Sequence, residues 1–269
     1  MDVKLTVVIL TWNSERYISN CLNSLLDSLN DIQAEVVVID NGSTDSTRKL
    51  ISAFSDERIQ VIYQSKNKGV STARNIGLRK AKGEYILLLD IDTVTNGTAI
   101  HSLLNFIEKH PDCGLCSCML ANSLGDIQNS CRKIPSIRFK LLNVLEALFE
   151  KMRLLRIKRC ISYSNRSQFY RNKFALKEAF EVEYLIGACQ MIRRKAFEQV
   201  GFLDEHIFYG PEDADFCIRL REKNWKVFYL PYVSIIHEYQ QISHKRLFSK
   251  MSFIHLKGLI YFFRKHKHI

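Results

Sequence analysis

The sequence predicts an α/β fold in which a mostly parallel central sheet is flanked by helices. Short runs of β-branched and apolar residues alternate along the chain with segments whose apolar residues recur at helical spacing. The strand-like runs are apolar throughout, as in strands that are buried on both faces of a parallel sheet. A strand, a helix and a second strand in that order favour a right-handed crossover, the repeating unit of such sheets.

The N-terminal elements follow this order. Strands are predicted at 4–10 and 35–39, and the residues between them that recur at helical spacing are Ile18, Leu22, Leu25, Leu26 and Leu29. A helix at about 45–54, a strand at 59–63, a helix at 70–81 and a strand at 84–89 continue the pattern. Ser43 or Thr44 is predicted to cap the helix at 45–54, because their oxygens accept hydrogen bonds from free first-turn amides.

The C-terminal part repeats the alternation with less regularity. A strand is predicted at 181–192, where Gly187 and Ala188 form a small-residue spot that admits a ligand or a close backbone. The remaining predicted elements are a short helix at 194–200, a loop at 202–209, a helix from 212 to 223 and a last strand at 227–230. His237 then lies just beyond this last strand.

Polar residues follow three of the predicted strands. They are residues 11–13 after the first, residues 40–42 after the second, and Asp90 and Asp92 after the strand that ends in LLL. Each group alone fits ordinary turn chemistry, since Asn, Asp and Gly favour turns. The carboxyl ends of parallel strands meet at one sheet edge, however, so the three together predict a binding crevice there. Burying an unpaired carboxylate costs free energy, so the two acids are expected to bind a partner.

The motifs, taken in order, resemble those of family 2 glycosyltransferases. They are VVILTWNSE, VVVIDNGSTDST, NKGVSTARNIGL, LLLDIDT and YGPEDADFCIRLREKNWKV, followed by a His. The resemblance covers about residues 4–131 and 182–240 and is strongest to the bacterial rhamnosyltransferase-like branch. It implies an inverting enzyme of GT-A fold that moves rhamnose or another hexose in bacterial surface polysaccharide synthesis.

A nucleotide-sugar donor requires sites for a base, a ribose and a diphosphate. The resemblance assigns the donor site to Thr11, Trp12, Asn13, Glu15, Asp40, Asn67, Gly69, Arg74 and Asp90. Asp40 can accept the imide N–H of uracil or thymine, which cytosine lacks, and this favours a UDP- or dTDP-sugar. Gly69 precedes a helix whose free amides can face anions, although a plain tight turn explains this glycine equally well.

The diphosphate leaving group must be neutralised as its bond to the sugar breaks. A divalent cation does this without a proton, and Mg²⁺ or Mn²⁺ prefers carboxylate oxygens. The resemblance makes Asp92 the metal ligand, places Asp90 nearer the ribose or the outer shell of the metal, and makes His237 a second ligand. The alternative for His237 is a structural role, which is more common for a single His.

Inversion also requires a base that removes the proton of the acceptor hydroxyl. The resemblance places it at Asp213, beside Glu212, and the neighbouring acids Glu212 and Asp215 are expected to raise its proton affinity. The alternative is that these acids only complement the dipole of a helix N-terminus. Residues expected on the acceptor side are Gly187, Ala188 and Tyr209.

The positive charge of the chain is unevenly distributed. Residues 132–177 hold 13 Lys/Arg against 2 Asp/Glu, and residues 241–269 hold 7 Lys/Arg and no acid, so the rest of a chain of net charge +11 is acidic. Within 138–156, the apolar residues Leu141, Leu145, Leu148, Met152 and Leu155 fall on one helical face. Basic amphipathic helices favour a membrane surface. Packing on the catalytic body is the alternative.

The predicted organisation is one catalytic domain over 1–240, with a basic helical insertion at about 132–180 and a basic, aromatic helical tail at 241–269. No apolar run is long enough to span a membrane and no signal-peptide layout is visible. We therefore expect a cytoplasmic protein on the inner face of the cell membrane. Its expected partners are a nucleotide-diphosphate sugar, a glycan or polyprenyl-diphosphate-linked acceptor and an anionic lipid surface.

Other classes of protein fit less well. A nucleic-acid-binding protein would explain the charge, but the basic residues avoid the predicted crevice and no nucleic-acid-binding motif is visible, so no nucleic-acid partner is expected. A nucleotide-binding scaffold without catalysis would leave Asp92, Asp213 and His237 unexplained together. A nucleotidyltransferase would leave Asp213 unexplained. Cys113, Cys116 and Cys118 lack a second ligand pair at zinc spacing and are expected as reduced thiols on a buried strand.

Overall fold

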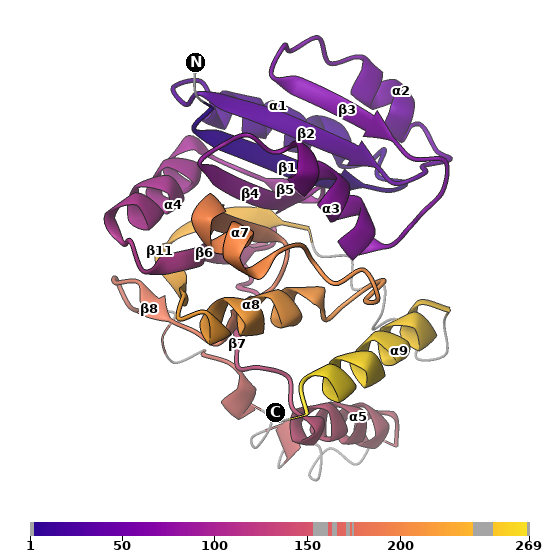
Figure 1. Ribbon diagram of the computed structural model, residues 1–269. Helices are drawn as coiled ribbons and strands as arrows, with labels where there is room; N and C mark the ends of the chain where they lie inside the picture. The colour runs from indigo at the N-terminus through magenta and orange to yellow at the C-terminus, as the bar shows by residue number, and fades with distance from the viewer. Residues whose placement is uncertain are drawn as a thin grey trace.

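The computed structural model describes residues 3–152, 161–162, 166–170, 173, 175–238 and 250–267. Within these residues the chain forms a nine-stranded mixed sheet flanked by helices, in the order β3-β2-β1-β4-β10-β6-β11-β5, with β8 paired to β11 (Figure 1). A separate two-stranded sheet joins β7 and β9. The predicted α/β class is confirmed.

The strands are β1 (Leu5–Thr11), β2 (Ala34–Asp40), β3 (Ile59–Tyr63), β4 (Tyr85–Asp90), β5 (Thr93–Val94), β6 (Cys113–Ala121), β7 (Cys131–Arg132), β8 (Phe180–Glu181), β9 (Tyr184–Leu185), β10 (Cys189–Arg193) and β11 (Lys226–His237). The helices are α1 (Ile18–Ser28), α2 (Thr47–Ser52), α3 (Val70–Lys80), α4 (Gly97–Lys109), α5 (Ile137–Lys151), α7 (Arg194–Val200), α8 (Glu212–Glu222) and α9 (Lys250–Lys265), with a 3₁₀ turn at Arg166–Gln168.

The N-terminal half follows the predicted crossovers. β1 pairs in parallel with β2 and with β4, and β2 pairs in parallel with β3. The apolar face of α1, including Ile18, Leu22 and Leu25, is fully buried with α4 on one side of the sheet. Helices α3, α7 and α8 contribute to a second core on the other side. The carboxyl ends of β1, β2 and β4 therefore share one edge.

Two local predictions in this half need correction. Helix α2 begins after Ser46 and has no side-chain cap hydrogen bond. Ser43 and Thr44 instead fasten the loop after β1: Asn13 N donates to Ser43 Oγ at 2.9 Å, and Thr44 N donates to Asn13 Oδ1 at 2.8 Å. A tertiary partner thus uses the Ser43 hydroxyl oxygen that a cap would use. Strand β5 and helix α4 were not predicted.

The C-terminal half departs further from the prediction. The predicted strand at 181–192 is three short strands, because β8 pairs with β11, β9 with β7, and β10 with β4 and β6. The last strand is longer than predicted and includes His237, with a register shift between Leu230 and Ser234. Which edge a short apolar run joins depends on distant partners, and periodicity does not reveal them.

The buried-thiol prediction for β6 is confirmed. Cys113, Cys116 and Cys118 are fully buried in the sheet, and the cysteines within the described ranges are free and buried. Burial raises the pKa of Cys116 well above its usual range, because the thiolate would lose its solvation. These residues therefore behave as small apolar side chains.

The basic helices α5 and α9 are drawn at the end of the molecule away from α2 and β3 (Figure 1). Of the predicted apolar face of the insertion, Leu141, Leu145 and Met152 are exposed. Leu148 and Leu155 lie outside the residues whose side chains are described, as do residues 241–249 of the tail. Across the described ranges, no helix combines the length and hydropathy needed to cross a bilayer.

Candidate active site

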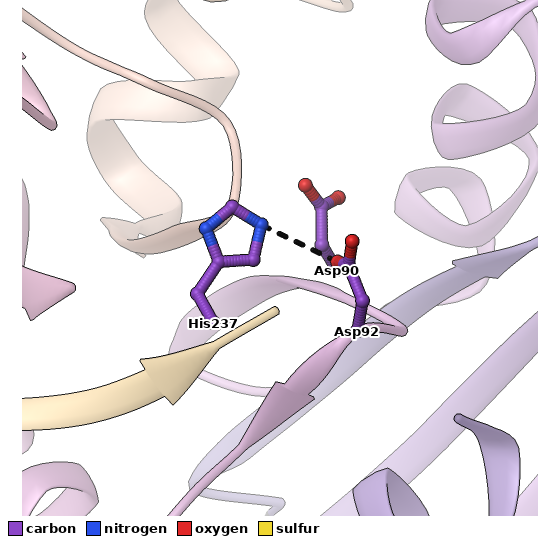
Figure 2. A group of neighbouring side chains, drawn as sticks. All are labelled: Asp90, Asp92 and His237. Carbon is purple, nitrogen blue, oxygen red and sulfur yellow. Dashed lines mark ion pairs between the residues drawn. The ribbon is translucent and has the colours of Figure 1, made fainter. Parts of the chain in front are cut away.

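Three side chains with metal-ligating atoms meet at the carboxyl edge of the sheet. Asp90 ends β4, Asp92 follows two residues later, and His237 ends β11 (Figure 2). The antiparallel pair between Thr93 and His237 brings the two segments together, and Glu238 N donates to Asp92 O at 2.8 Å. One ligand atom from each of the three lies within 4.8 Å of the others. The intervening Ile91 turns into the core.

His237 is held in a defined orientation. Its Nε2 lies 3.3 Å from Asp92 Oδ1, and its Nδ1 lies 2.7 Å from Gln128 Oε1. Gln128 Nε2 also donates to the carbonyl of His237 at 2.7 Å. Burial lowers the pKa of His237, but the hydrogen bond and charge of Asp92, together with the charge of Asp90, outweigh burial and raise it. In the neutral ring, Nδ1–H donates to Gln128 and the lone pair of Nε2 faces the acids.

Two carboxylates and an imidazole suit a divalent cation such as Mn²⁺ or Mg²⁺. Burial and the charge of Asp92 raise the pKa of Asp90 although Arg74 opposes this, as expected where two like charges share a site. A cation would relieve that repulsion, so the residues fit the metal that the sequence predicts. Gln128 was not predicted; it lies outside the recognised motifs, and only its contacts identify it.

Arg74 links the acids to the other wall of the site. Its side chain is 3% exposed, and Nη2 donates to Asp90 Oδ1 at 2.5 Å and to Gly187 O at 2.8 Å. A Cβ on Gly187 would lie 2.5 Å from Arg74 Nη1, so any larger residue there would force the guanidinium to shift. Ala188, also predicted on the acceptor side, is buried and accepts from Asp90 N at 2.9 Å.

Asp213 and Glu212 begin α8 and face this wall. Asp213 Oδ2 accepts from Gly187 N at 3.3 Å, and its Oδ1 accepts from Ala214 N at 2.8 Å. Hydrogen bonds therefore run from Asp90 through Arg74 and Gly187 to Asp213. The chain brings the predicted metal acids and the predicted base into one site.

Glu212 is the more buried of the two acids that begin α8. This residue is 7% exposed and its Oε2 has no hydrogen-bond partner among the described residues. Burial first, and then the charge of Asp213, raise the pKa of Glu212 to about 7. Asp215, expected from the sequence to act on Asp213, is fully buried and paired with Arg219, Lys265 and His266. Its charge is neutralised locally.

Asp40, the predicted base-reading residue, is fully buried at the end of β2. Arg48 Nε donates to Asp40 Oδ2 at 2.6 Å, and Ser43 N donates to the same carboxylate at 3.2 Å. Arg48 was not predicted. The only signal in the sequence is its position eight residues after Asp40, in helix α2, which follows the loop after β2. Trp12 is 46% exposed on the neighbouring loop, where an aromatic ring can stack on a base.

The other predicted donor residues have structural hydrogen bonds. Asn13 adopts a positive φ and bonds the Ser43 hydroxyl and the Thr44 amide, as described above, and Glu15 Oε2 accepts from Ser46 N at 2.9 Å. Asn67 Oδ1 accepts from Gly69 N at 2.9 Å. Gly69 has φ +88°, and a Cβ there would lie 2.7 Å from Phe208 O, so the tight-turn interpretation accounts for this glycine. Thr11 is buried, and its hydroxyl has no partner among the described side chains.

A hollow of about 350 Å³ lies beside Asp92. Among the residues that line it are Arg16, Tyr17, Ser123 and Glu238. Arg16 is a cation that lines the same hollow as Asp92, and it immediately follows the WNSE motif. Tyr209, the remaining predicted acceptor-side residue, lies in the loop before α8 and contacts α9, its ring 6.1 Å from that of His255.

The model of Glycosyl transferase family 2 matches residues 6–201 of this chain. The chain belongs to this family. A second model, described as the N-terminal domain of galactosyltransferase, matches residues 167–245, which include α8 and β11. The match to family 2 confirms the family that the motifs resemble.

Curated relatives share part of this family 2 chain. The low-salt glycan biosynthesis hexosyltransferase Agl10 of Haloferax volcanii is 27% identical over 237 residues, which are 87% of this chain and 66% of the relative. Glycosyltransferase GlyG of Streptococcus pneumoniae is 30% identical over 111 residues, which are 40% of this chain and 36% of GlyG. The chain thus spans a minority of the length of GlyG.

Solved structures share the fold. The mannosyltransferase PcManGT of Pyrobaculum calidifontis, in complex with GDP-Man and Mn²⁺, aligns with TM-score 0.59 and 18% identity over 90% of this chain and 58% of its own. Staphylococcus aureus TarS 1–349 aligns with TM-score 0.56 and 18% identity over 87% of this chain and 60% of its own. These likenesses confirm the glycosyltransferase fold.

Proposed function

We propose that this protein is an inverting glycosyltransferase that moves a hexose, rhamnose among the candidates, from a UDP- or dTDP-sugar to a hydroxyl of a glycan or lipid-linked saccharide. The observation that supports this most is that Asp92 and His237 have ligand atoms within 4.8 Å of Asp90, from which hydrogen bonds run through Arg74 and Gly187 to Asp213. In a family 2 chain, this set provides a leaving-group site and a base within one crevice.

The metal-binding residues and the base Asp213 have different roles in this proposal. Asp92 and His237, with Asp90 beside them, would hold a divalent cation, which when bound supplies positive charge for the diphosphate leaving group. Arg74 fixes the Asp90 carboxylate and joins it to the wall at Gly187. Asp213 accepts the proton of the acceptor hydroxyl as the oxygen attacks the sugar from the face opposite the diphosphate.

The proposed donor rests on the base pocket and on the relatives. Asp40 keeps carboxylate lone pairs beyond those used by Arg48 and Ser43. Because Asp40 is fully buried, its surrounding side chains must move before an imide N–H can use one. TarS has been solved with UDP and with UDP-GlcNAc, and GalNAc-T7 with UDP, GalNAc and Mn²⁺. These likenesses favour a UDP-sugar and a manganese ion as the first compounds to examine.

The proposed acceptor lies at an anionic membrane surface. Exposed apolar side chains lie along the two basic helices: Ile137, Leu141, Leu145 and Met152 on α5 or just after it, and Phe253, Leu256 and Ile260 on α9. Lys257 lies over the ring of Phe253, which places a cation beside an apolar side chain. Helices of this kind bind lipid through the apolar stripe and through attraction of Lys and Arg to anionic headgroups. Polyprenyl-diphosphate-linked saccharides occur at such surfaces.

A thermal-shift screen tests the proposed donor class directly. A ligand that binds only the folded state raises its apparent stability. We expect UDP or dTDP, with or without a hexose, to raise the melting temperature, and to raise it more when Mn²⁺ is present. GDP-mannose serves as the matched non-pyrimidine control. A larger shift with GDP-mannose than with any pyrimidine nucleotide would overturn the proposed reading by Asp40.

A further inference from the structure

The tail helix α9 packs directly against the loop that leads into α8. A Cβ on Gly258 would lie 2.7 Å from the carbonyl of Gly210, so the two backbones approach closely, and His255 Nδ1 is 3.0 Å from a Cβ built on Gly210. Phe262 is fully buried in the same core as Ala214 and Phe216 of α8. Helix α9 also lies outside the ranges matched by the two family models, 6–201 and 167–245.

The end of α9 and the residue after it pair with Asp215, in the first turn of α8. This carboxylate is fully buried, and its Oδ1 lies 2.6 Å from Lys265 Nζ and 2.8 Å from His266 Nε2. Its Oδ2 accepts from Arg219 Nε at 2.9 Å, within α8 itself. A buried carboxylate is costly unless it is paired, so α9 supplies partners that the first turn of α8 requires.

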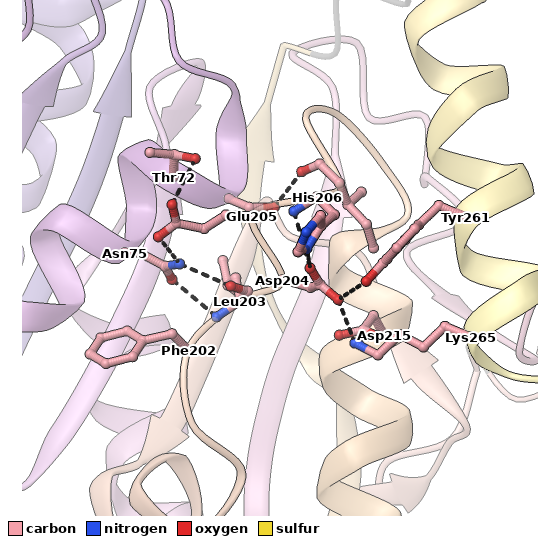
Figure 3. Close-up of polar contacts among 12 residues, drawn as sticks. Thr72, Asn75, Phe202, Leu203, Asp204, Glu205, His206, Asp215, Tyr261 and Lys265 are labelled. Carbon is pink, nitrogen blue, oxygen red and sulfur yellow. Dashed lines mark hydrogen bonds and ion pairs between the residues drawn. The ribbon is translucent and has the colours of Figure 1, made fainter.

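Lys265 also holds the loop at 203–208, as Figure 3 shows. Its Nζ lies 2.7 Å from Asp204 Oδ2, and the Tyr261 hydroxyl donates to the same oxygen at 3.0 Å. Burial alone would raise the pKa of Asp204, but the hydrogen bonds from Lys265 and His206 outweigh burial and hold it well below its usual range. One ammonium group therefore bridges the loop and α8.

The other side of the loop is fixed to α3, the helix that carries Arg74. Asn75 exchanges hydrogen bonds with the backbone of Leu203, with Nδ2 donating at 2.9 Å and Oδ1 accepting at 3.0 Å. Ser71 Oγ donates to Ile207 O at 2.6 Å. Helix α3, the loop, α9 and α8 thus form one connected set on the Asp213 side of the crevice.

We propose that Lys265 and His266 are positioning residues, which hold the first turn of α8 and the 203–208 loop in place so that Asp213 faces the acceptor side of the crevice. This inference rests on the proposed role of Asp213 as the base. Asp213 is two residues from Asp215, and its hydrogen bond to Gly187 N is 3.3 Å long. Its position is set by α8, and small displacements of a reacting group reduce rate strongly.

The test compares three single variants at neighbouring positions of α9. Lys265→Gln removes the bridging charge, Arg264→Gln removes one charge from an exposed neighbour, and Lys265→Arg keeps the charge. Release of UDP from UDP-N-acetylglucosamine with water as acceptor is measured in the absence of lipid. We expect Lys265→Gln to lower kcat by about tenfold or more with KM for the donor within about twofold, because the acids that Lys265 pairs with, Asp204 and Asp215, are neither donor nor metal residues. Arg264→Gln and Lys265→Arg should match the wild type.

Hydrogen exchange gives a readout that needs no turnover. In Lys265→Gln we expect faster amide exchange in α8 and at 203–208, with β1 and β4 unchanged and with Mn²⁺–UDP affinity unchanged. The proposal fails if Lys265→Gln behaves like Arg264→Gln, if donor affinity falls as much as kcat, or if exchange rises uniformly across the body. A wild-type protein that turns over no nucleotide sugar would instead overturn the proposed function, whatever the variants show in exchange.

Discussion

The two carboxylates at the end of β4, Asp90 and Asp92, differ in their surroundings, and we propose a different role for each. Asp90 is bound to the buried Arg74, whereas Asp92 faces His237, which Gln128 orients. The motif LLLDIDT predicts that two acids reach the sheet edge, with Ile91 turned inward. Only the contacts show that Asp90 already has a cation partner and that Asp92 is the acid beside the imidazole.

At this scale, Asp92→Ala should remove metal dependence together with activity, since the remaining His237 and Asp90 leave an incomplete ligand set. Mn²⁺ titration followed by thermal shift measures the first effect, and UDP release from a UDP-sugar measures the second. Asp31→Asn, an exposed acid far along the sequence, is the control. Full activity in Asp92→Ala would reject the metal site.

Asp213→Asn should abolish transfer while leaving donor binding intact. The amide keeps the shape of the side chain and a hydrogen-bonding oxygen, but it cannot take a proton, and a general base contributes about 10²–10⁴ in rate. Single-turnover transfer and UDP affinity, measured on the same preparation, separate the two effects. An equal loss of donor affinity would count against the assignment of Asp213 as the base.

Glu212 predicts a pH dependence of stability. Its folded-state pKa of about 7 lies above the ordinary value of 4.5, so the folded protein binds the proton more tightly. The stabilisation is present below about pH 4.5 and is lost as pH rises through about 7, up to about 3 kcal/mol. Glu212→Gln should therefore melt near the wild type at about pH 5.5 and above it at about pH 8.5. The same difference in melting temperature between Glu212→Gln and the wild type at both pH values would contradict the raised pKa of Glu212.

At the scale of elements, the short segment between β9 and β10 shows what periodicity could not predict. Gly187 was predicted to be a small-residue spot, and it is where Arg74 passes between the acids and α8. The strand predicted across it is interrupted, because its backbone carbonyl bonds Arg74 and its amide bonds Asp213. A backbone that uses its polar groups on side chains cannot also continue a ladder.

Gly187→Ala should destabilise the protein by about 1–3 kcal/mol and lower Mn²⁺–UDP affinity, because the new methyl group lies in the space of the guanidinium. Chemical denaturation and UDP titration are the measurements. Gly97→Ala is the matched control, since a Cβ there meets no other atom within 4 Å. Wild-type affinity in Gly187→Ala would show that the position of Arg74 does not matter for the donor.

At the scale of the whole molecule, α9 has two faces with different partners. Its buried face, with Leu259 and Phe262, packs on the body, and its exposed face carries Phe253, Leu256 and Ile260. The sequence left open whether the tail packs on the body or binds lipid. The packing on the body is now observed, and the exposed stripe supports lipid binding as a proposal.

The protein should float with vesicles that contain phosphatidylglycerol and not with phosphatidylcholine vesicles, and added salt should weaken the association. Replacing Phe253 and Leu256 with Ser should release it, because both exposed side chains leave the apolar stripe. Leu124→Ser, at an exposed position outside α5 and α9, is the control. Equal flotation of the Phe253 and Leu256 variant would rule out this face as the docking site.

The sequence by itself determined the crossovers, the sheet edge and the acids placed there, because strand and helix periodicities and turn residues are local signals. Tertiary structure alone decided which acids are partnered. Arg74 meets Gly187 across 113 positions, Gln128 meets His237 across 109, and His266 meets Asp215 across 51. Such pairs depend on how distant elements pack together, and this packing produces no periodic pattern in the sequence of either paired segment. For that reason the sequence did not show that burial raises the pKa of Glu212. It also did not show that Asp215 is paired with Lys265 of α9, a helix outside both family matches.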